Sequence, residues 1–210
     1  MQSKKQTRTS RTIKQHTKAN NNKTKKNKFS RLQIGCHASI TPSILAGLQY
    51  AREIGANAAQ IFLGSNRSAS LKTKTHLTSA DIQEIKKFLA ASKMLLIIHT
   101  IYLLNLCKAP PHSGQVKWQH ANVLHDMQMG AKLGARCVVL HLGSRMGMPI
   151  QEALDNLIAN VNHILARAPH GIQLALETAA GAGSQVGYTL EELAVIWRGV
   201  CHHGSHRVGI

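Results

Sequence analysis

Three apolar segments of this chain each end on a side chain that commonly binds metal ions. Residues 94–98 lead into His99, residues 137–140 into His141, and residues 171–176 into Glu177. His141 follows His99 by 42 residues and Glu177 follows His141 by 36, which each time is enough for one strand, one helix and two loops. Because the carboxyl ends of neighbouring parallel strands meet on one face of a barrel, we expect these three side chains to converge.

Two imidazoles and one carboxylate around a common point form a zinc site with a coordination position left open for water. Such a site activates water for attack on a phosphodiester, although displacement also needs a further metal to neutralise the leaving oxygen. A lone buried histidine is more often a hydrogen-bonded core residue, but the joint placement of His99 and His141 with Glu177 favours a metal. We expect Glu177 to be a buried carboxylate whose charge requires a partner. His37, also at a strand end, either supports this site or simply packs.

The body of the chain alternates short apolar runs with helical segments. The runs that fit buried strands are residues 32–36, 58–63, 94–99, 137–141, 171–177 and 206–210. Helices between them are expected to begin at Thr41-Pro42, at a capping box of Thr78 and Asp81, near Val116, at Pro149, and at a box of Thr189 and Glu192. Strict alternation of this kind implies a parallel sheet.

The arrangement of the candidate ligands favours a barrel over an open doubly wound sheet. Residues 35–37 are Gly-Cys-His, which is not the glycine-rich dinucleotide loop expected after the first strand of a doubly wound domain. The ligands are spread over successive strands rather than gathered at one crevice. The sequence therefore predicts an α/β fold of the TIM (β/α)8 type over residues 31–210. The barrel is expected to be incomplete, with about five βα units and the start of a sixth strand.

The chain is strongly basic, with 26 Lys and Arg against nine acids and a formal charge of +17. Ten of the basic residues lie in the first 30 positions, which contain no acid, and the remainder still carries +7. A domain with an excess of positive charge favours phosphate-rich partners, above all nucleic acid. A charge excess that only aids solubility is the alternative. No apolar run approaches the roughly 20 residues that a membrane-spanning helix needs, so we expect no membrane partner.

Residues 1–30 are polar and basic, and we expect them to form a disordered leader because they offer almost no apolar surface to bury. The leader lacks the apolar segment of a secretory signal. Nuclear or mitochondrial targeting, a non-specific DNA-binding arm and a solvated tail without a role all fit its composition. The four cysteines form no CxxC pair, which indicates a reducing, intracellular compartment. The sequence does not distinguish nucleus, cytoplasm and mitochondrion.

Several segments together resemble the endonuclease IV family of apurinic/apyrimidinic endonucleases. The matching segments are Ile-Gly-Cys-His-Ala-Ser at 34–39, Gln-Ile-Phe at 60–62, His-Thr-Ile-Tyr-Leu-Leu-Asn-Leu at 99–106, His-Leu-Gly-Ser at 141–144 and Glu-Thr-Ala-Ala-Gly-Ala-Gly-Ser at 177–184. They occur in the family's order over residues 32–210. Each motif alone is weak, but the set is specific.

The resemblance implies a TIM barrel with a three-zinc cluster that cleaves the phosphodiester 5′ to abasic sites in double-stranded DNA, a step of base excision repair. It assigns His99, His141 and Glu177 to one zinc, with Glu177 as the catalytic residue that also bridges to a second. The family's other ligands lie on strands six to eight. Only one full ligand set is therefore expected in a chain that stops at Ile210, as a C-terminally truncated member of the family would, and its activity is open.

The same resemblance places Arg67, Tyr102 and Leu103 in loops that enter the DNA and hold it bent. The family often carries a Trp shortly after this Arg, whereas the nearby position here is Ala69. The neighbouring His202, His203 and His206 resemble a loop before a strand rather than a metal site.

Two other functions fit the same residues. A sugar isomerase or epimerase of this barrel type also binds a divalent metal through His and Glu at strand ends. A non-catalytic DNA-binding remnant is the second, because an incomplete barrel exposes strand edges and core surface. The +7 charge of the body and the Arg67 loop favour DNA over a sugar. The sequence points to no protein partner.

Overall fold

The computed structural model of the chain describes residues 32–201 and 207–210. The expected leader and the residues His202, His203 and His206 lie outside the described residues. Contacts divide the chain into residues 1–32 and residues 33–210, and the strands and helices all belong to the second unit.

Among the described residues, six strands form one parallel sheet in which each strand pairs with the next one along the chain. The strands are β1 (Gly35–His37), β2 (Ala58–Phe62), β3 (Leu95–His99), β4 (Cys137–His141), β5 (Gln173–Glu177) and β6 (Val208–Gly209). A doubly wound sheet reverses its strand order at a switch point, whereas a TIM barrel keeps the order of the chain. The predicted fold class, with five βα units and the start of a sixth strand, is confirmed.

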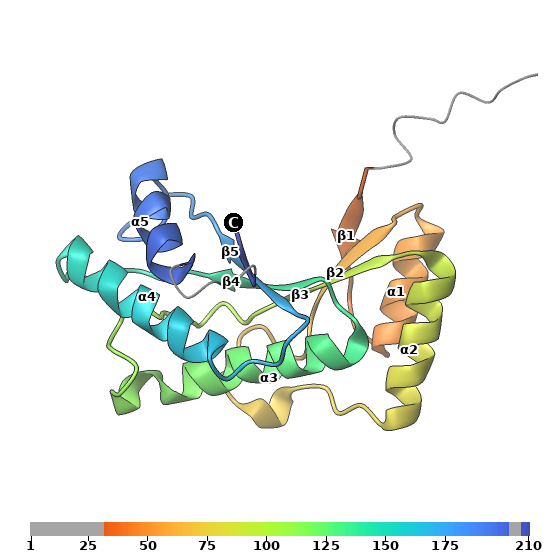
Figure 1. Cartoon of the computed structure of the whole chain (residues 1–210). Helices are drawn as coiled ribbons and strands as arrows, with labels where there is room; N and C mark the ends of the chain where they lie inside the picture. The colour runs from red at the N-terminus through yellow and green to blue at the C-terminus, as the bar shows by residue number, and fades with distance from the viewer. Residues whose placement is uncertain (1–31, 202–206) are drawn as a thin grey trace, which may run out of the picture. The chain divides into compact units, whose positions relative to one another are not determined.

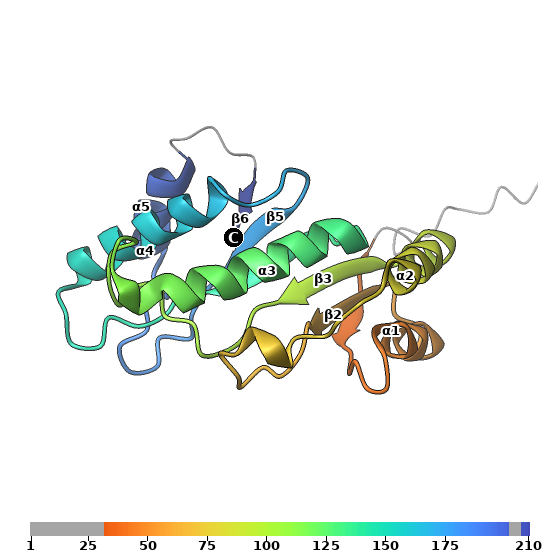
Figure 2. The same ribbon diagram turned by 90° about the horizontal axis from the view of Figure 1, so that it is seen from below.

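In the part of the chain that the structure describes, five α-helices follow the strands in turn and lie along one side of the curved sheet (Figure 1). They are α1 (Ile44–Glu53), α2 (Ser79–Ser92), α3 (Lys117–Leu133), α4 (Ile150–Leu165) and α5 (Leu190–Cys201), with short 3₁₀ turns η2 (Leu71–Thr73) and η3 (Gly114–Val116). Figure 2, seen from the helical side, shows α3 running along β3. Among the described residues, no helix combines the length and the apolar character that crossing a bilayer requires.

Side chains alternate between the two faces of every strand, and this period of two separates core from site. In β4, Val138 and Leu140 point toward the helices and are fully buried, while Val139 and His141 point to the inner face and are partly exposed. The same alternation holds in β5 and in β3 as far as Ile98, whereas His99 is buried despite its inward parity. His99, His141 and Glu177 have the inward parity of their strands, so the packing of the helices against the sheet directs all three to the same side.

Helix starts follow the expected capping chemistry at some positions and not at others. The capping box is confirmed at α2, where Thr78 Oγ1 accepts from the Asp81 amide and the Asp81 carboxylate accepts from the Thr78 amide. The prediction for α1 is wrong, because Ser43 caps this helix: its backbone is extended and its Oγ accepts from the Ala46 amide at 3.1 Å. Pro42 therefore precedes the cap instead of occupying the first helical turn.

At α5 only half of the expected box forms. Thr189 Oγ1 accepts from the Glu192 amide at 3.1 Å, as predicted. The Glu192 carboxylate, however, accepts from the Gly187 amide at 2.6 Å. It thereby ties the β5–α5 loop to the helix at Gly187, whose φ of 81° is in the region that favours glycine.

Candidate metal centre

His99, His141 and Glu177 are the last residues of β3, β4 and β5, and their side chains meet on the inner face of the sheet. One ligand atom from each lies within 4.8 Å of the other two. His99 Nε2 is 3.1 Å and His141 Nε2 is 3.4 Å from the same carboxylate oxygen, Oε2 of Glu177. Within the described residues this is the only group of three or more His, Cys, Asp or Glu side chains arranged to hold a metal. The convergence that the strand ends predict is present.

The hydrogen bonding of His99 directs one ring nitrogen at the centre. His99 Nδ1 lies 2.7 Å from the Thr100 carbonyl oxygen, and since a carbonyl only accepts, Nδ1 carries the proton. In the neutral ring, Nε2 then presents its lone pair to Glu177 Oε2, which is also an acceptor. Two acceptors at 3.1 Å need a cation or a proton between them. An imidazole whose second nitrogen donates to a backbone carbonyl is the usual arrangement of a metal-binding histidine.

His141 decides between a proton and a metal at this point. Its Nε2 is buried and has no hydrogen-bond partner, although it lies within ion-pair distance of Glu177. One proton shared by His99 and Glu177 would leave this nitrogen unsatisfied, at the cost of a buried orphan polar atom. A single cation would satisfy both imidazoles and the carboxylate, so the donor set fits a divalent metal better than it fits an ion pair.

The expectation that Glu177 is buried is wrong, because 42% of its side chain is exposed. It is the last residue of β5, and its side chain lies on the inner face of the sheet, opposite the helices. Solvent therefore reaches the carboxylate, and burial alone does not force a charged partner on it. The exposure has a consequence for chemistry, because it leaves this side of the centre open to water and substrate.

Aromatic rings pack around the two imidazoles. The Tyr102 ring centroid lies 5.6 Å from that of His99 and 5.4 Å from that of His141, in edge-to-face contacts. The Phe62 ring lies 5.0 Å from that of His99 and 5.2 Å from that of Tyr102. His37 stacks on Phe62 at 4.5 Å, and its Nδ1 bonds Gln60 Nε2. Burial lowers the pKa of His37, and His99 adds to this lowering. His37 therefore packs beside the centre and lies outside the ligand group.

The residues expected to contact DNA lie on two loops next to the centre. Tyr102 and Leu103 follow β3 and are 52% and 48% exposed. Arg67 is exposed on the loop after β2. The Tyr102 amide donates to the Asn66 carbonyl at 3.1 Å, so the two loops lie side by side. Ala69, near the position where the family often carries a Trp, is exposed and accepts from the Asn122 side chain through its carbonyl.

Comparison with known proteins identifies the family. A family model described as a xylose isomerase-like TIM barrel matches residues 48–210. A putative endonuclease 4 of Acanthamoeba polyphaga mimivirus is 28% identical over 79% of this chain, and a probable endonuclease 4 of Akkermansia muciniphila is 32% identical over 78%. The chain belongs to the endonuclease IV family of xylose isomerase-like TIM barrels.

This endonuclease IV-family chain spans about half the length of the curated relatives it matches, 53% of the mimivirus protein and 57% of the Akkermansia protein. Solved structures agree on the fold. Endonuclease IV from Thermus thermophilus superposes with a TM-score of 0.59 and 24% identity over 77% of this chain and 56% of that one. A D-tagatose 3-epimerase-like protein superposes with a TM-score of 0.61 and 20% identity. The match covers 83% of this chain and 62% of that one. At these identities the superpositions establish the barrel type alone.

Sequence reasoning missed the residues that hold the loops around the centre. Asn105 lies inside the family-like segment after His99, and its side-chain amide donates to the Ser144 carbonyl while its Oδ1 accepts from the Ser144 amide. Gly143 has a positive φ of 109°, and any side chain there would collide with Asn105. Neither residue gives a local signal of this contact, because the two meet only through the parallel pairing of β3 and β4.

The pKa of His141 leads to a testable pH dependence. Burial lowers this pKa below the usual 6.5 more than Glu177 raises it, and His99 adds to the lowering. His141 is therefore expected to be neutral at pH 6.5 in metal-free protein, to protonate only at more acidic pH, and to release metal there because only the neutral ring binds it. NMR titration of the ring proton, assigned by its loss in His141→Asn, measures the midpoint. A midpoint above 6.5 contradicts this prediction.

Proposed function

We propose that this endonuclease IV-family chain is a zinc-dependent hydrolase that cleaves the phosphodiester 5′ to an abasic site in double-stranded DNA, as in base excision repair. The proposal depends on one observation: the His99, His141 and Glu177 centre lies beside the loops that carry Arg67 and Tyr102. The endonuclease names of its relatives and the formal charge of +17 support a DNA substrate.

The chemistry at the centre follows from its donor set. A zinc ion held by His99, His141 and Glu177 would supply Lewis-acid stabilisation of the phosphodiester and activation of water for in-line attack. The Thr100 carbonyl holds the His99 ring in the orientation that presents Nε2. Glu177 brings a negative charge to an open position that a phosphate can reach, and we assign it as the catalytic residue. The described residues contain one such ligand group, and the further metal that would neutralise the leaving oxygen would need ligands outside this group.

The two loops would recognise the missing base. Tyr102 and Leu103 form an exposed apolar pair beside the centre, which is the kind of wedge that inserts between base steps. In intact DNA such insertion costs a few kcal/mol of unstacking. At an abasic site the gap in the stack already exists, so the wedge enters at lower cost. Arg67 would contact the backbone phosphate and position the strand.

The deciding experiment incubates the full chain and zinc with a duplex that holds a single tetrahydrofuran abasic analogue. A nick on the 5′ side of the analogue, absent with EDTA and absent on the intact duplex, supports the proposal. Binding without a nick favours the non-catalytic DNA-binding remnant. Interconversion of a ketose, with no binding or nicking of DNA, favours the sugar epimerase and overturns the proposal.

Replacing Tyr102 by alanine is expected to weaken binding to the abasic duplex about tenfold, because aromatic stacking against bases contributes roughly 1–3 kcal/mol. Binding to the intact duplex should change much less. Fluorescence anisotropy in EDTA measures both affinities without cleavage. Tyr50→Ala is the matched control, since Tyr50 is 58% exposed on α1 of the outer helical layer. Equal losses in the two variants would remove Tyr102 from DNA recognition.

A further inference from the structure

Residues 64–74, which we name the Arg67 loop, form a closed unit after β2. Gly64 and Lys74 pair as an isolated antiparallel bridge, and the Thr75 amide donates to the Leu63 carbonyl at 2.8 Å. Gly64 has a φ of 150°, and a side chain there would collide with the Thr73 carbonyl. The ends of this loop are therefore joined, so whatever anchors the loop also sets the position of Arg67.

Beneath this loop, α3 carries a row of buried polar side chains, which we name the α3 polar stripe: Gln119, Asn122 and Asp126. Their exposed fractions are 1%, 1% and 0%. The spacing of three and four residues places them on one face of the helix. Buried polar groups are costly unless they are hydrogen-bonded, so the partners of these three side chains matter, although Asn122 Oδ1 has none among the described residues.

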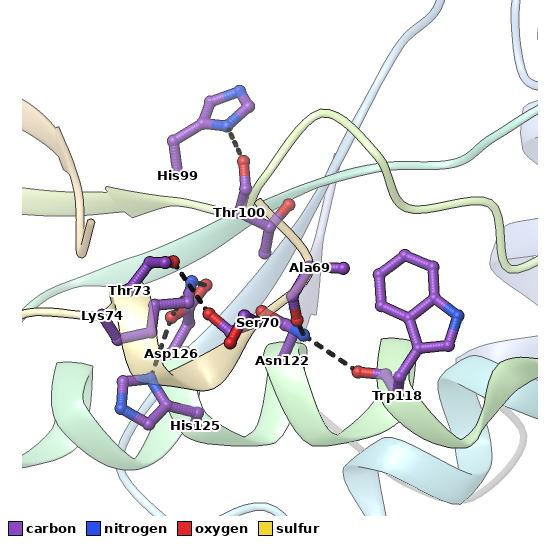
Figure 3. A network of polar contacts seen from close by, with 10 residues as sticks. All are labelled: Ala69, Ser70, Thr73, Lys74, His99, Thr100, Trp118, Asn122, His125 and Asp126. Atoms are coloured by element: carbon purple, nitrogen blue, oxygen red, sulfur yellow. Dashed lines mark hydrogen bonds and ion pairs between the residues drawn. The ribbon is translucent and has the colours of Figure 1, made fainter. Parts of the chain in front are cut away.

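Two members of the stripe bind the Arg67 loop (Figure 3). Asp126 accepts from the Lys74 ammonium through both carboxylate oxygens, at 2.9 and 3.0 Å, and the Lys74 and Asp126 side chains are 3% and 0% exposed. The side-chain amide of Asn122 donates to the Ala69 carbonyl at 2.9 Å. The loop is thus held at its end by an ion pair and in its middle by a hydrogen bond, and both partners come from one helix.

The third member binds the other loop. Gln119 Oε1 accepts from the Asn105 backbone amide at 2.5 Å. Asn105 lies in residues 100–109, which we name the Tyr102 loop. The two loops also touch directly, because the Tyr102 amide donates to the Asn66 carbonyl at 3.1 Å. One face of α3 therefore anchors both loops, and they share a hydrogen bond at the level of Tyr102.

We infer that Gln119, Asn122 and Asp126 are positioning residues that set the distance between the Arg67 loop and the Tyr102 loop, and thereby the affinity for DNA, without touching DNA or metal. The inference rests on the proposed function for the DNA part alone. A helix is a suitable reference for this purpose, since side chains on rigid elements hold a geometry more closely than side chains on loops do. The metal ligands come from strand ends that none of these three contacts.

The test compares Asn122→Ala with Asn162→Ala in the full chain. Asn162 is half-buried, and its amide donates to the Gly199 carbonyl at 3.1 Å, so the control removes the same kind of bond between α4 and α5. Asn122→Ala is expected to speed hydrogen exchange at the Tyr102 amide and across residues 64–74, and to weaken abasic-duplex binding about fivefold. Asn162→Ala should change neither. Zinc affinity should stay at the wild-type value in both variants.

Gln119→Met, close to glutamine in volume, is a second variant in case Asn122→Ala fails to fold. This variant is expected to speed hydrogen exchange at the Asn105 backbone amide and to weaken binding of the abasic duplex, as Asn122→Ala does. Unchanged exchange at these amides, or an equal effect of Asn162→Ala, overturns the inference. If the wild-type chain binds no abasic duplex, the proposed function fails, and the exchange comparison still decides whether the stripe couples the two loops.

Discussion

Glu177→Gln is expected to reduce zinc-dependent nicking of an abasic duplex by at least about a thousandfold, because a metal ligand that stabilises charge in the transition state supplies several kcal/mol. Glutamine keeps the size of the side chain but removes the negative charge that faces His99 Nε2 and His141 Nε2. Zinc affinity should fall with the nicking rate. Affinity for the abasic duplex in EDTA should stay within about threefold, since the contacts expected from Tyr102 and Arg67 remain.

The matched control is Glu84→Gln, which makes the same chemical change on the exposed face of α2, outside the centre. Rates are measured with single-turnover nicking, and zinc affinity by competition with a chromogenic chelator. Wild-type nicking by Glu177→Gln removes this residue from the mechanism. Loss of zinc affinity without loss of nicking would mean that another site carries the reaction.

Lys74→Met is expected to lower the free energy of unfolding by about 3–5 kcal/mol, because removing one partner of a buried ion pair leaves the other charge uncompensated. The remaining partner, the Asp126 carboxylate, is fully buried and would keep only the His125 Nδ1 contact at 3.2 Å. Urea unfolding followed by far-ultraviolet circular dichroism measures the change. The effect should be as large in EDTA as in zinc, since the pair lies outside the metal ligands.

Two further variants isolate the cause. Lys86→Met removes an exposed lysine from α2 and should change stability by less than about 0.5 kcal/mol. The double variant Lys74→Met with Asp126→Leu replaces the pair by apolar side chains and should recover most of the lost stability, because buried pairs are often no better than well-packed apolar residues. A double variant as unstable as Lys74→Met alone would show that the packing of the loop, rather than the unpaired charge, is what is lost.

Particular residues show which structural features the local sequence predicted and where it failed. Local patterns predicted the ends of β3, β4 and β5 because short continuous apolar runs are typical of buried strands and the polar residue after them marks the end. Local chemistry also predicted the Thr78 and Asp81 capping box, whose partners are three residues apart. It failed at α1, where Thr41 and Ser43 are both good caps and the path of the chain selects Ser43.

Contacts remote in sequence were beyond local reasoning. Lys74 and Asp126 are 52 residues apart, and each alone resembles an ordinary solvated charge. The α3 polar stripe likewise resembles a solvent-facing side of a helix, because nothing nearby in the chain shows that the Arg67 loop covers it. The exposure of Glu177 is a third case, since the sequence alone does not show how much of the inner face of the sheet other segments cover.

The amino-acid sequence by itself determined the family, the order of strands and helices, and which three side chains end neighbouring strands. Strands and helices follow from residues close together in the chain, and parallel pairing then brings the strand ends together in a fixed register. Only the tertiary structure decided how open the metal centre is and what holds the loops around it. Those properties depend on buried polar contacts between segments 14 to 53 residues apart, and such contacts leave no periodic trace in the chain.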